Sequence, residues 1–141
     1  MSANFRVTLT GYTSYKGREG FIAFLLHRIT GLGTLLFLTF HIATTATVYF
    51  SPQWYDRLIM VFRWPLIMFL EIILVFCVIY HGVNGLRLAY FDLIRPEMYL
   101  SKSWKTSFKS TILLTILLWL PLATIMSYNL LKYGLGLFGG N

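Results

Sequence analysis

From Phe62 to Arg87 the chain reads FRWPLIMFLEIILVFCVIYHGVNGLR, a stretch that is mostly apolar and ends in a group of polar side chains. A transmembrane helix needs about 20 predominantly apolar residues to cross roughly 30 Å of hydrocarbon. Two other windows of this character run from Phe21 to Phe50 and from Ser107 to Leu131. The sequence therefore predicts an all-α integral membrane protein with three transmembrane helices, at about 21–50, 62–87 and 107–131.

The overall composition also indicates a membrane protein. Of the 141 residues, 57% are hydrophobic and 12% are charged, whereas ordinary soluble proteins carry about 25% charged residues. The length suits one domain, and no internal repeat or low-complexity tract divides it. We interpret residues 1–141 as a single membrane domain, with lipid as its surroundings.

Basic side chains are distributed unequally between the two sides that three crossings would create. Only Arg57, Arg63 and Lys132 fall on the side of the first loop and the C-terminus. The side of the N-terminus and the second loop holds Arg6, Lys16, Arg18, Arg28, Arg87, Arg95, Lys102, Lys105 and Lys109. Cytoplasmic loops carry an excess of Lys and Arg. The pattern predicts a multi-pass protein of the inner (cytoplasmic) membrane, with residues 1–20 in the cytoplasm and the C-terminus on the outer side.

The same distribution accounts for the formal net charge of +7. The basic residues flank the predicted spans and form no groove or run, so we expect no nucleic-acid partner. The first 20 residues contain no short apolar segment before a small-residue cleavage site, and we expect no removable signal peptide.

The first predicted span carries a stripe of polar and small residues. Steps of three and four residues place side chains on one face of a helix. Such steps connect His27, Gly31, Thr34, Leu38, His41 and Thr45. Polar residues at membrane depth are costly and usually face the interior of a bundle. The stripe is therefore either a packing face with interhelical hydrogen bonds or a face that binds a cofactor.

A third intramembrane histidine favours the interpretation that the stripe binds a cofactor. His81 lies beside Gly82 and one turn from Gly85, and glycines leave clearance for a planar macrocycle. Neutral imidazole is a common metal ligand, and axial side chains from bundled helices hold haem iron in electron-transfer proteins. We therefore predict that His81 and His41 each ligate a haem iron.

The two predicted ligands lie at different depths. At about 1.5 Å of rise per residue, His41 lies about 21 Å beyond His27 towards the outer side, whereas His81 lies about 10 Å from the cytoplasmic boundary. We therefore expect two separate haems, proximal and distal to the cytoplasm. The remaining ligands would come from another polypeptide with intramembrane histidines of its own.

Motifs for other cofactors are missing from the chain. Cys77 is the one cysteine, which excludes a CxxCH haem attachment and an iron–sulfur cluster held by this chain alone. No GxGxxG or GxxxxGK[ST] motif is present. Flavin or iron–sulfur chemistry would have to reside in partner subunits.

Two short motifs carry a resemblance to a known family. The first is HRITG, His27 to Gly31, similar to a His-Arg-x-Ser/Thr-Gly pattern at the start of that family's first span. The second consists of His81, Gly85, Arg87 and Asp92, similar to His-x-x-x-Gly-x-Arg followed five residues later by Asp. With three spans in this orientation, the chain resembles the cytochrome b membrane-anchor (C) subunit of succinate:quinone oxidoreductase over nearly its whole length.

The resemblance implies roles for particular side chains around haem. His81 would be the axial ligand of the proximal haem b, and His41 resembles the first-span ligand of two-haem members. His27 and Arg87 would lie by the haem propionates, whose carboxylates they offset or hydrogen-bond.

The resemblance also implies a quinone site and a set of partners. Arg28 would line the pocket for ubiquinone or menaquinone. One-haem ubiquinone-reducing members carry a serine three residues before the His-Arg pair, where this chain has Phe24, and Thr30 is a substitute donor. The partners would be a flavoprotein subunit with FAD, an iron–sulfur subunit and a second three-helix membrane anchor. The enzyme would be the complex, because no residue of this chain could bind flavin or a dicarboxylate.

Two other interpretations remain open from the sequence. A haem-free interaction or transport subunit could use the polar stripe for packing, and a b cytochrome of another respiratory complex could use it for haem. Glu71, well inside the second span, is costly there unless paired or protonated. We hypothesise that it belongs to a proton route towards the distal haem region.

Overall fold

The computed structural model describes residues 18–97 and 103–137, and within these ranges it contains helices and no strand. The elements are α2 (Arg18–Phe50), α3 (Pro52–Phe62), α4 (Pro65–Leu93), α5 (Ser103–Asn129) and the π-helical turn η2 (Leu130–Gly134). Three segments are long and apolar enough to cross a membrane: Glu19–Phe50, Pro65–Leu93 and Thr106–Gly134. The predicted all-α membrane fold is confirmed. Most of the segment predicted to be cytoplasmic, residues 1–17, lies outside the described residues.

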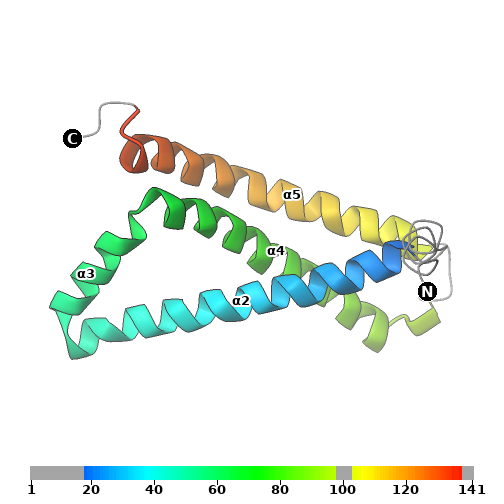
Figure 1. The fold of residues 1–141 in the computed structure, drawn as a ribbon. Helices are drawn as coiled ribbons and strands as arrows, with labels where there is room; N and C mark the ends of the chain where they lie inside the picture. The colour runs from blue at the N-terminus through cyan, green and yellow to red at the C-terminus, as the bar shows by residue number, and fades with distance from the viewer. Residues whose placement is uncertain (1–17, 98–102, 138–141) are drawn as a thin grey trace, which may run out of the picture.

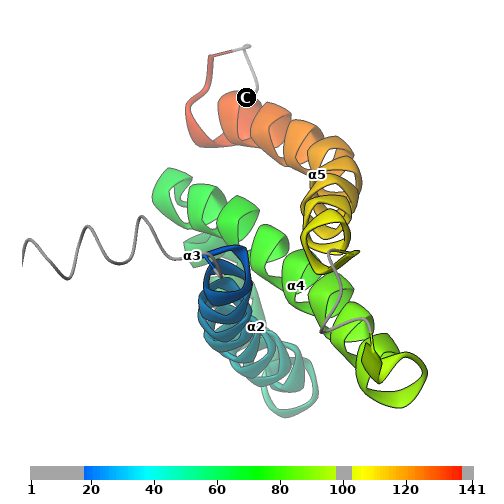
Figure 2. The same ribbon diagram turned by 90° about the vertical axis from the view of Figure 1, so that its right-hand side faces the viewer.

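The three long helices alternate in direction, and α4 lies between the other two (Figures 1 and 2). It packs extensively against both α2 and α5, which contact each other over a shorter stretch. We call the end where α2 begins and α4 ends the N-terminal end of the bundle. The opposite end, closed by α3, is the α3 end (Figure 1).

Helix α3 lies in the connection between the first two predicted spans, for which the sequence analysis predicted no helix. Ser51 is extended and Pro52 occupies the first helical position, where its missing N–H costs nothing. The helix is amphipathic, with Trp54 exposed and the Arg57 guanidinium 5.4 Å from the centre of the Trp54 ring. Such a helix suits the boundary between lipid and water.

The second long helix begins and ends later than the expected span of 62–87. Pro65 starts α4 after extended Trp64, and Phe62 is the last residue of α3. At the other end, Arg87 is only 8% exposed because it packs inside the contact with α5, and the helix continues to Leu93. Arg87, which ends the apolar run in the sequence, therefore lies within helix α4 and not at its end.

Helix α4 contacts its two neighbours through different faces. Tyr80, Asn84, Arg87 and Phe91, all buried, recur at steps of four and three on the side of α5. On α5 this contact includes buried Thr111 and Thr115, whose hydroxyls donate to carbonyls of their own helix. Small residues of this kind allow membrane helices to approach closely. The side chain of His81, in contrast, is turned to α2.

Few large apolar side chains are buried in the isolated chain. The buried hydrophobic residues among those described are Ala23, Ile72, Tyr80, Phe91 and Ala123. Large apolar side chains such as Leu32 and Leu86 are instead at least 70% exposed. Such an exterior suits lipid or the apolar surface of other membrane helices.

Candidate functional site

Two histidines from different helices stack on each other where α2 crosses α4. The ring centroids of His27 and His81 are 4.2 Å apart and the ring planes differ by 7°. Each histidine is followed four residues later by a glycine, Gly31 on α2 and Gly85 on α4. The rings pack reciprocally: His81 lies against Gly31, and the His27 ring is the nearest group to Gly85. We call this arrangement the His27–His81 pair.

The two glycines leave different amounts of room. A methyl carbon built on Gly31 would lie 2.9 Å from Cε1 and 3.2 Å from Nδ1 of His81. The same carbon on Gly85 would lie 3.8 Å from Cε1 of His27, an ordinary contact. Gly82 has open space beside it within the described chain. A side chain at position 31 would therefore force the His81 ring to shift.

The main chain of α2 selects the tautomer of His81. Nδ1 of His81 lies 3.1 Å from the backbone oxygen of His27. A carbonyl oxygen only accepts hydrogen bonds, so Nδ1 carries the proton and donates. In a neutral imidazole the other nitrogen, Nε2, then has a free lone pair. This is the arrangement in which a histidine serves as a metal ligand with its second nitrogen anchored by the protein.

The second ring of the pair has an unsatisfied atom. Nδ1 of His27 is buried and has no hydrogen-bond partner among the described residues. A buried polar atom without a partner costs about 1–3 kcal/mol. Among residues 18–97 and 103–137, Nδ1 of His27 is therefore a polar atom whose bonding capacity is unused.

Arg87 lies at the same end of the bundle but on the side of α5. Its Nε donates to Ser107 Oγ and its Nη1 to Asn84 Oδ1, each at 3.0 Å. The guanidinium also lies 5.4 Å from the centre of the Phe91 ring and 5.9 Å from that of Phe108. The structure thus brings His27 and His81 together and places Arg87 in a separate network between α4 and α5.

The two residues predicted for the quinone site differ in exposure. Arg28 is exposed, and its guanidinium lies 5.3 Å from the centre of the Phe24 ring one turn earlier. Thr30 is 3% exposed. Its hydroxyl lies 2.7 Å from the oxygen of Leu26 and 3.2 Å from that of His27, so it donates within its own helix. Arg28 is accessible to a ligand, whereas the Thr30 hydroxyl is already hydrogen-bonded within α2.

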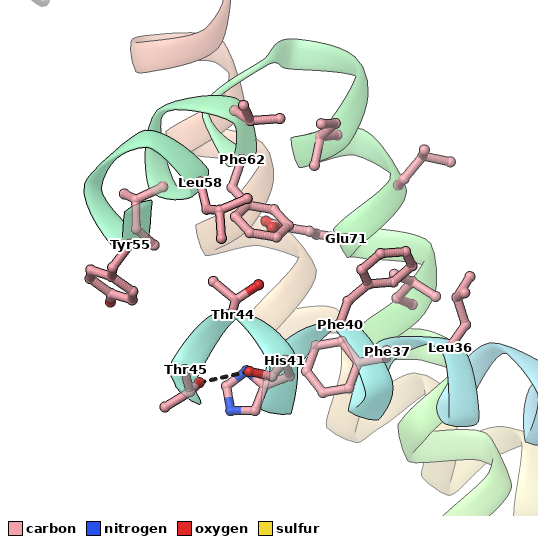
Figure 3. A pocket seen from close by; sticks show the side chains of 15 residues that line it. Leu36, Phe37, Phe40, His41, Thr44, Thr45, Tyr55, Leu58, Phe62 and Glu71 are labelled. Atoms are coloured by element: carbon pink, nitrogen blue, oxygen red, sulfur yellow. Dashed lines mark hydrogen bonds between the residues drawn. The ribbon is translucent and has the colours of Figure 1, made fainter. Parts of the chain in front are cut away.

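A cavity of about 650 Å³ occupies the α3 end, between α2, α3 and α4. Figure 3 shows residues that line it: His41 on α2, Glu71 on α4, and Tyr55, Leu58 and Phe62 on α3. His41 is exposed, and its ring centroid lies 5.5 Å from that of Phe37. We call this space the α3-end cavity. Sequence reasoning assigned both His41 and Glu71 to the distal haem region, and it missed the wall that α3 supplies.

His41 and His81 lie in different parts of the molecule. The contact with His27 fixes the level of His81, and His41 follows His27 by about 21 Å along the helix axis at about 1.5 Å per residue. His81 belongs to the His27–His81 pair and His41 to the α3-end cavity. One planar macrocycle could not reach both rings.

Comparisons with known proteins point to one family. Residues 7–122 match the family model of the succinate dehydrogenase/fumarate reductase transmembrane subunit. The succinate dehydrogenase 2 membrane subunit SdhC of Mycobacterium tuberculosis (strain ATCC 25618 / H37Rv) is 32% identical over 80 residues. That match covers 57% of this chain and 59% of the relative. Since the family model spans most of the chain, the chain belongs to the succinate dehydrogenase/fumarate reductase transmembrane subunits.

Proposed function

We propose that this chain is the haem b-binding membrane anchor of a succinate:quinone oxidoreductase, respiratory complex II. In this role it passes electrons between an iron–sulfur subunit and membrane quinone. The observation that carries the proposal is the hydrogen bond from Nδ1 of His81 to the backbone oxygen of His27, which leaves Nε2 available. Family membership supports the same role for the chain.

His81 is the proposed axial ligand of the proximal haem. Three features fit that group: the anchored tautomer, the unpartnered Nδ1 of His27, and the open space beside Gly82. Haem b, when bound, supplies one-electron transfer at its iron. The chain contributes the ligand nitrogen and the groups that hold it.

His27 and Arg87 are the proposed partners of the haem propionates. Nδ1 of His27 is a buried ring nitrogen still able to bond. The Arg87 guanidinium supplies positive charge at the same end of the bundle, where Nε and Nη1 are bonded to Ser107 and Asn84. Charge-assisted bonds of this kind are about twice as strong as neutral ones.

His41 is the proposed ligand of a second, distal haem shared with the partner anchor. It lines the α3-end cavity, and about 650 Å³ is within the roughly 300–1,000 Å³ of ligand pockets. Glu71 lines the same cavity, which supports the hypothesis of a proton route to that region. With Glu71→Gln, we expect the pH dependence and membrane-potential sensitivity of turnover to change, and unchanged behaviour would refute the hypothesis.

The proposed quinone site includes Arg28 and Thr30, for either ubiquinone or menaquinone. Arg28 is the accessible donor of the two. The Arg28 guanidinium lies over the Phe24 ring. Where some members have a serine hydroxyl, this site would therefore have an apolar ring. Thr30 would take part only by releasing a carbonyl of its own helix.

The proposed complex contains the other redox groups. FAD would reside in a flavoprotein subunit, the clusters in an iron–sulfur subunit, and the remaining haem ligands in a second three-helix anchor. This chain alone would not catalyse succinate chemistry. We propose that it lies in the inner membrane with the N-terminal end of the bundle on the cytoplasmic side, where the iron–sulfur subunit would bind.

The experiment that tests the proposal is a haem count on the purified complex, by pyridine haemochrome and reduced-minus-oxidised spectra. We expect two haems b in the wild type, one after His81→Ala and one after His41→Ala, with different spectral components lost. Thr39→Ala is a matched control, because Thr39 is exposed on α2 and donates only to Leu35 of its own helix.

Other counts would change the proposal in defined ways. One haem that is insensitive to His41→Ala would remove the distal haem and keep the anchor function. A complex without haem would leave the His27–His81 pair as a helix-packing device and refute haem binding.

A further inference from the structure

The His27–His81 pair has two contacts that the propionate role of His27 does not use. One is the face of the His27 ring, which lies flat on His81. The other is the backbone oxygen of His27, which accepts from His81 Nδ1. The edge of the ring that would meet a propionate carries Nδ1 and is a third, separate feature.

The backbone contact depends on the glycine that follows one turn later. Gly31 stands on the side of α2 on which His81 approaches the His27 oxygen. A side chain at that position would meet the imidazole at 2.9–3.2 Å. A carbonyl oxygen has two lone pairs and can accept from His81 in addition to a helix N–H. Gly31 therefore exposes a main-chain acceptor to the neighbouring helix.

Together the two contacts leave the His81 ring little freedom. The hydrogen bond at the ring edge fixes which nitrogen is protonated and where Nε2 points. The parallel stack, at 4.2 Å and 7°, fixes the rotation of the ring about its Cβ–Cγ bond. Outer-shell groups that fix the tautomer and orientation of a metal-ligating histidine also tune its strength as a ligand.

We propose that His27 is the positioning residue of His81, through its ring face and its backbone oxygen. This inference rests on the proposed function, because it concerns His81 as a haem ligand. It assigns to His27 a role on its own neighbouring helix, in addition to any bond to a propionate. This positioning role needs a flat aromatic ring at position 27. It does not need a nitrogen atom in that ring.

Two substitutions separate the ring face from the ring nitrogens. His27→Phe keeps a flat ring and the backbone oxygen but removes both nitrogens. His27→Leu keeps the backbone oxygen and removes the flat ring as well. Leu32→Ala is the control for an altered side chain elsewhere on α2, because Leu32 is 70% exposed.

The measurements are made on the purified complex with all of its subunits. They are the haem b content, the low-spin electron paramagnetic resonance signal of the proximal haem, and the fraction of reduced haem that binds carbon monoxide. A six-coordinate haem with a firmly held ligand excludes carbon monoxide, and a loosely held ligand admits it.

We expect the wild type and Leu32→Ala to share one narrow low-spin signal and to bind no carbon monoxide at the proximal haem. His27→Phe loses the proposed bond to a propionate, so we expect it to hold less haem than the wild type, but the haem that it retains should still give a narrow low-spin signal and exclude carbon monoxide. We expect His27→Leu to retain haem, with a shifted and broadened signal and a fraction of haem that binds carbon monoxide. Equal carbon monoxide binding by the retained haem of His27→Phe and His27→Leu would overturn the inference.

A second variant keeps the inference testable if His27→Leu does not assemble. Gly31→Ala leaves His27 intact and pushes the His81 ring away from the backbone oxygen. We expect the same spectral shift and binding of carbon monoxide, and a wild-type signal would overturn the inference. A haem-free wild-type complex would refute the proposed function itself, a result distinct from any difference among variants that bind haem.

Discussion

Three glycines near the crossing of α2 and α4 differ in how closely neighbouring side chains approach them. Gly31 is in tight contact with His81, Gly85 is in ordinary contact with His27, and Gly82 adjoins open space. The three are alike in sequence, since each lies near an intramembrane histidine. Their packing environments distinguish them, and the consequence can be measured.

We expect Gly31→Ala to be less stable than Gly85→Ala by about 1–3 kcal/mol, the usual cost of overpacking. Both changes gain about 0.5–1 kcal/mol of helix propensity, so Gly85→Ala should be neutral or slightly stabilising. Thermal unfolding of the purified complex in detergent compares the two variants. Equal midpoints would show that the His81 ring moves aside without cost.

Between helices, the contact of α4 with α5 depends on polar groups inside an apolar surface. Arg87 and Asn84 are 8% and 1% exposed, and Ser107 accepts from Arg87 across the interface. The Trp119 indole N–H also donates to the backbone oxygen of Ile72, at 3.0 Å. Hydrogen bonds of this type hold membrane helices at a defined rotation, because lipid offers no substitute partner.

Ser107→Ala should therefore destabilise the contact between α4 and α5. The substitution removes an acceptor from a buried guanidinium, and hydrogen bonds to charged groups are worth about 1.5–3 kcal/mol. Ser110→Ala is the matched control, since Ser110 is exposed and donates to Thr106 of its own helix. Denaturant titration of the complex should give a lower midpoint for Ser107→Ala only. A similar loss in both variants would contradict an interhelical role.

The whole molecule has two unlike ends in the proposed membrane orientation. The N-terminal end holds the His27–His81 pair and the Arg87 network, and the α3 end holds the cavity with His41 and Glu71. The excess of Lys and Arg predicts that the N-terminal end faces the cytoplasm. The amphipathic helix α3 would then lie at the outer surface.

Labelling of single cysteines checks this orientation. In a Cys77→Ser background, Gln53→Cys lies at the start of α3 and Glu97→Cys follows α4, and both native side chains are exposed. We expect a membrane-impermeant maleimide to label Gln53→Cys in spheroplasts and to label Glu97→Cys only after permeabilisation. The reverse pattern would invert the topology and place the predicted proximal haem on the outer side.

The sequence by itself determined the three spans and the family motifs. Apolar length and the HRITG motif are properties of contiguous residues, so they can be recognised without knowing how helices pack. The same holds for the separation of His41 from His27, which follows from the rise of one helix. A histidine followed four positions later by a glycine also occurs twice in the sequence, at His27 and Gly31 and at His81 and Gly85. This pattern is the sequence signal that could have pointed to the His27–His81 pair.

Only the tertiary structure decided which of these residues meet. It stacked His27 on His81, turned Arg87 towards α5, bonded the Thr30 hydroxyl within its own helix, and formed a cavity lined by His41 and Glu71. The physical reason is that an almost uniformly apolar helix has no strong polar side to set its rotation. The rotation and register of each helix are instead fixed by close packing at small residues and by a few interhelical hydrogen bonds, which arise between segments far apart in the chain.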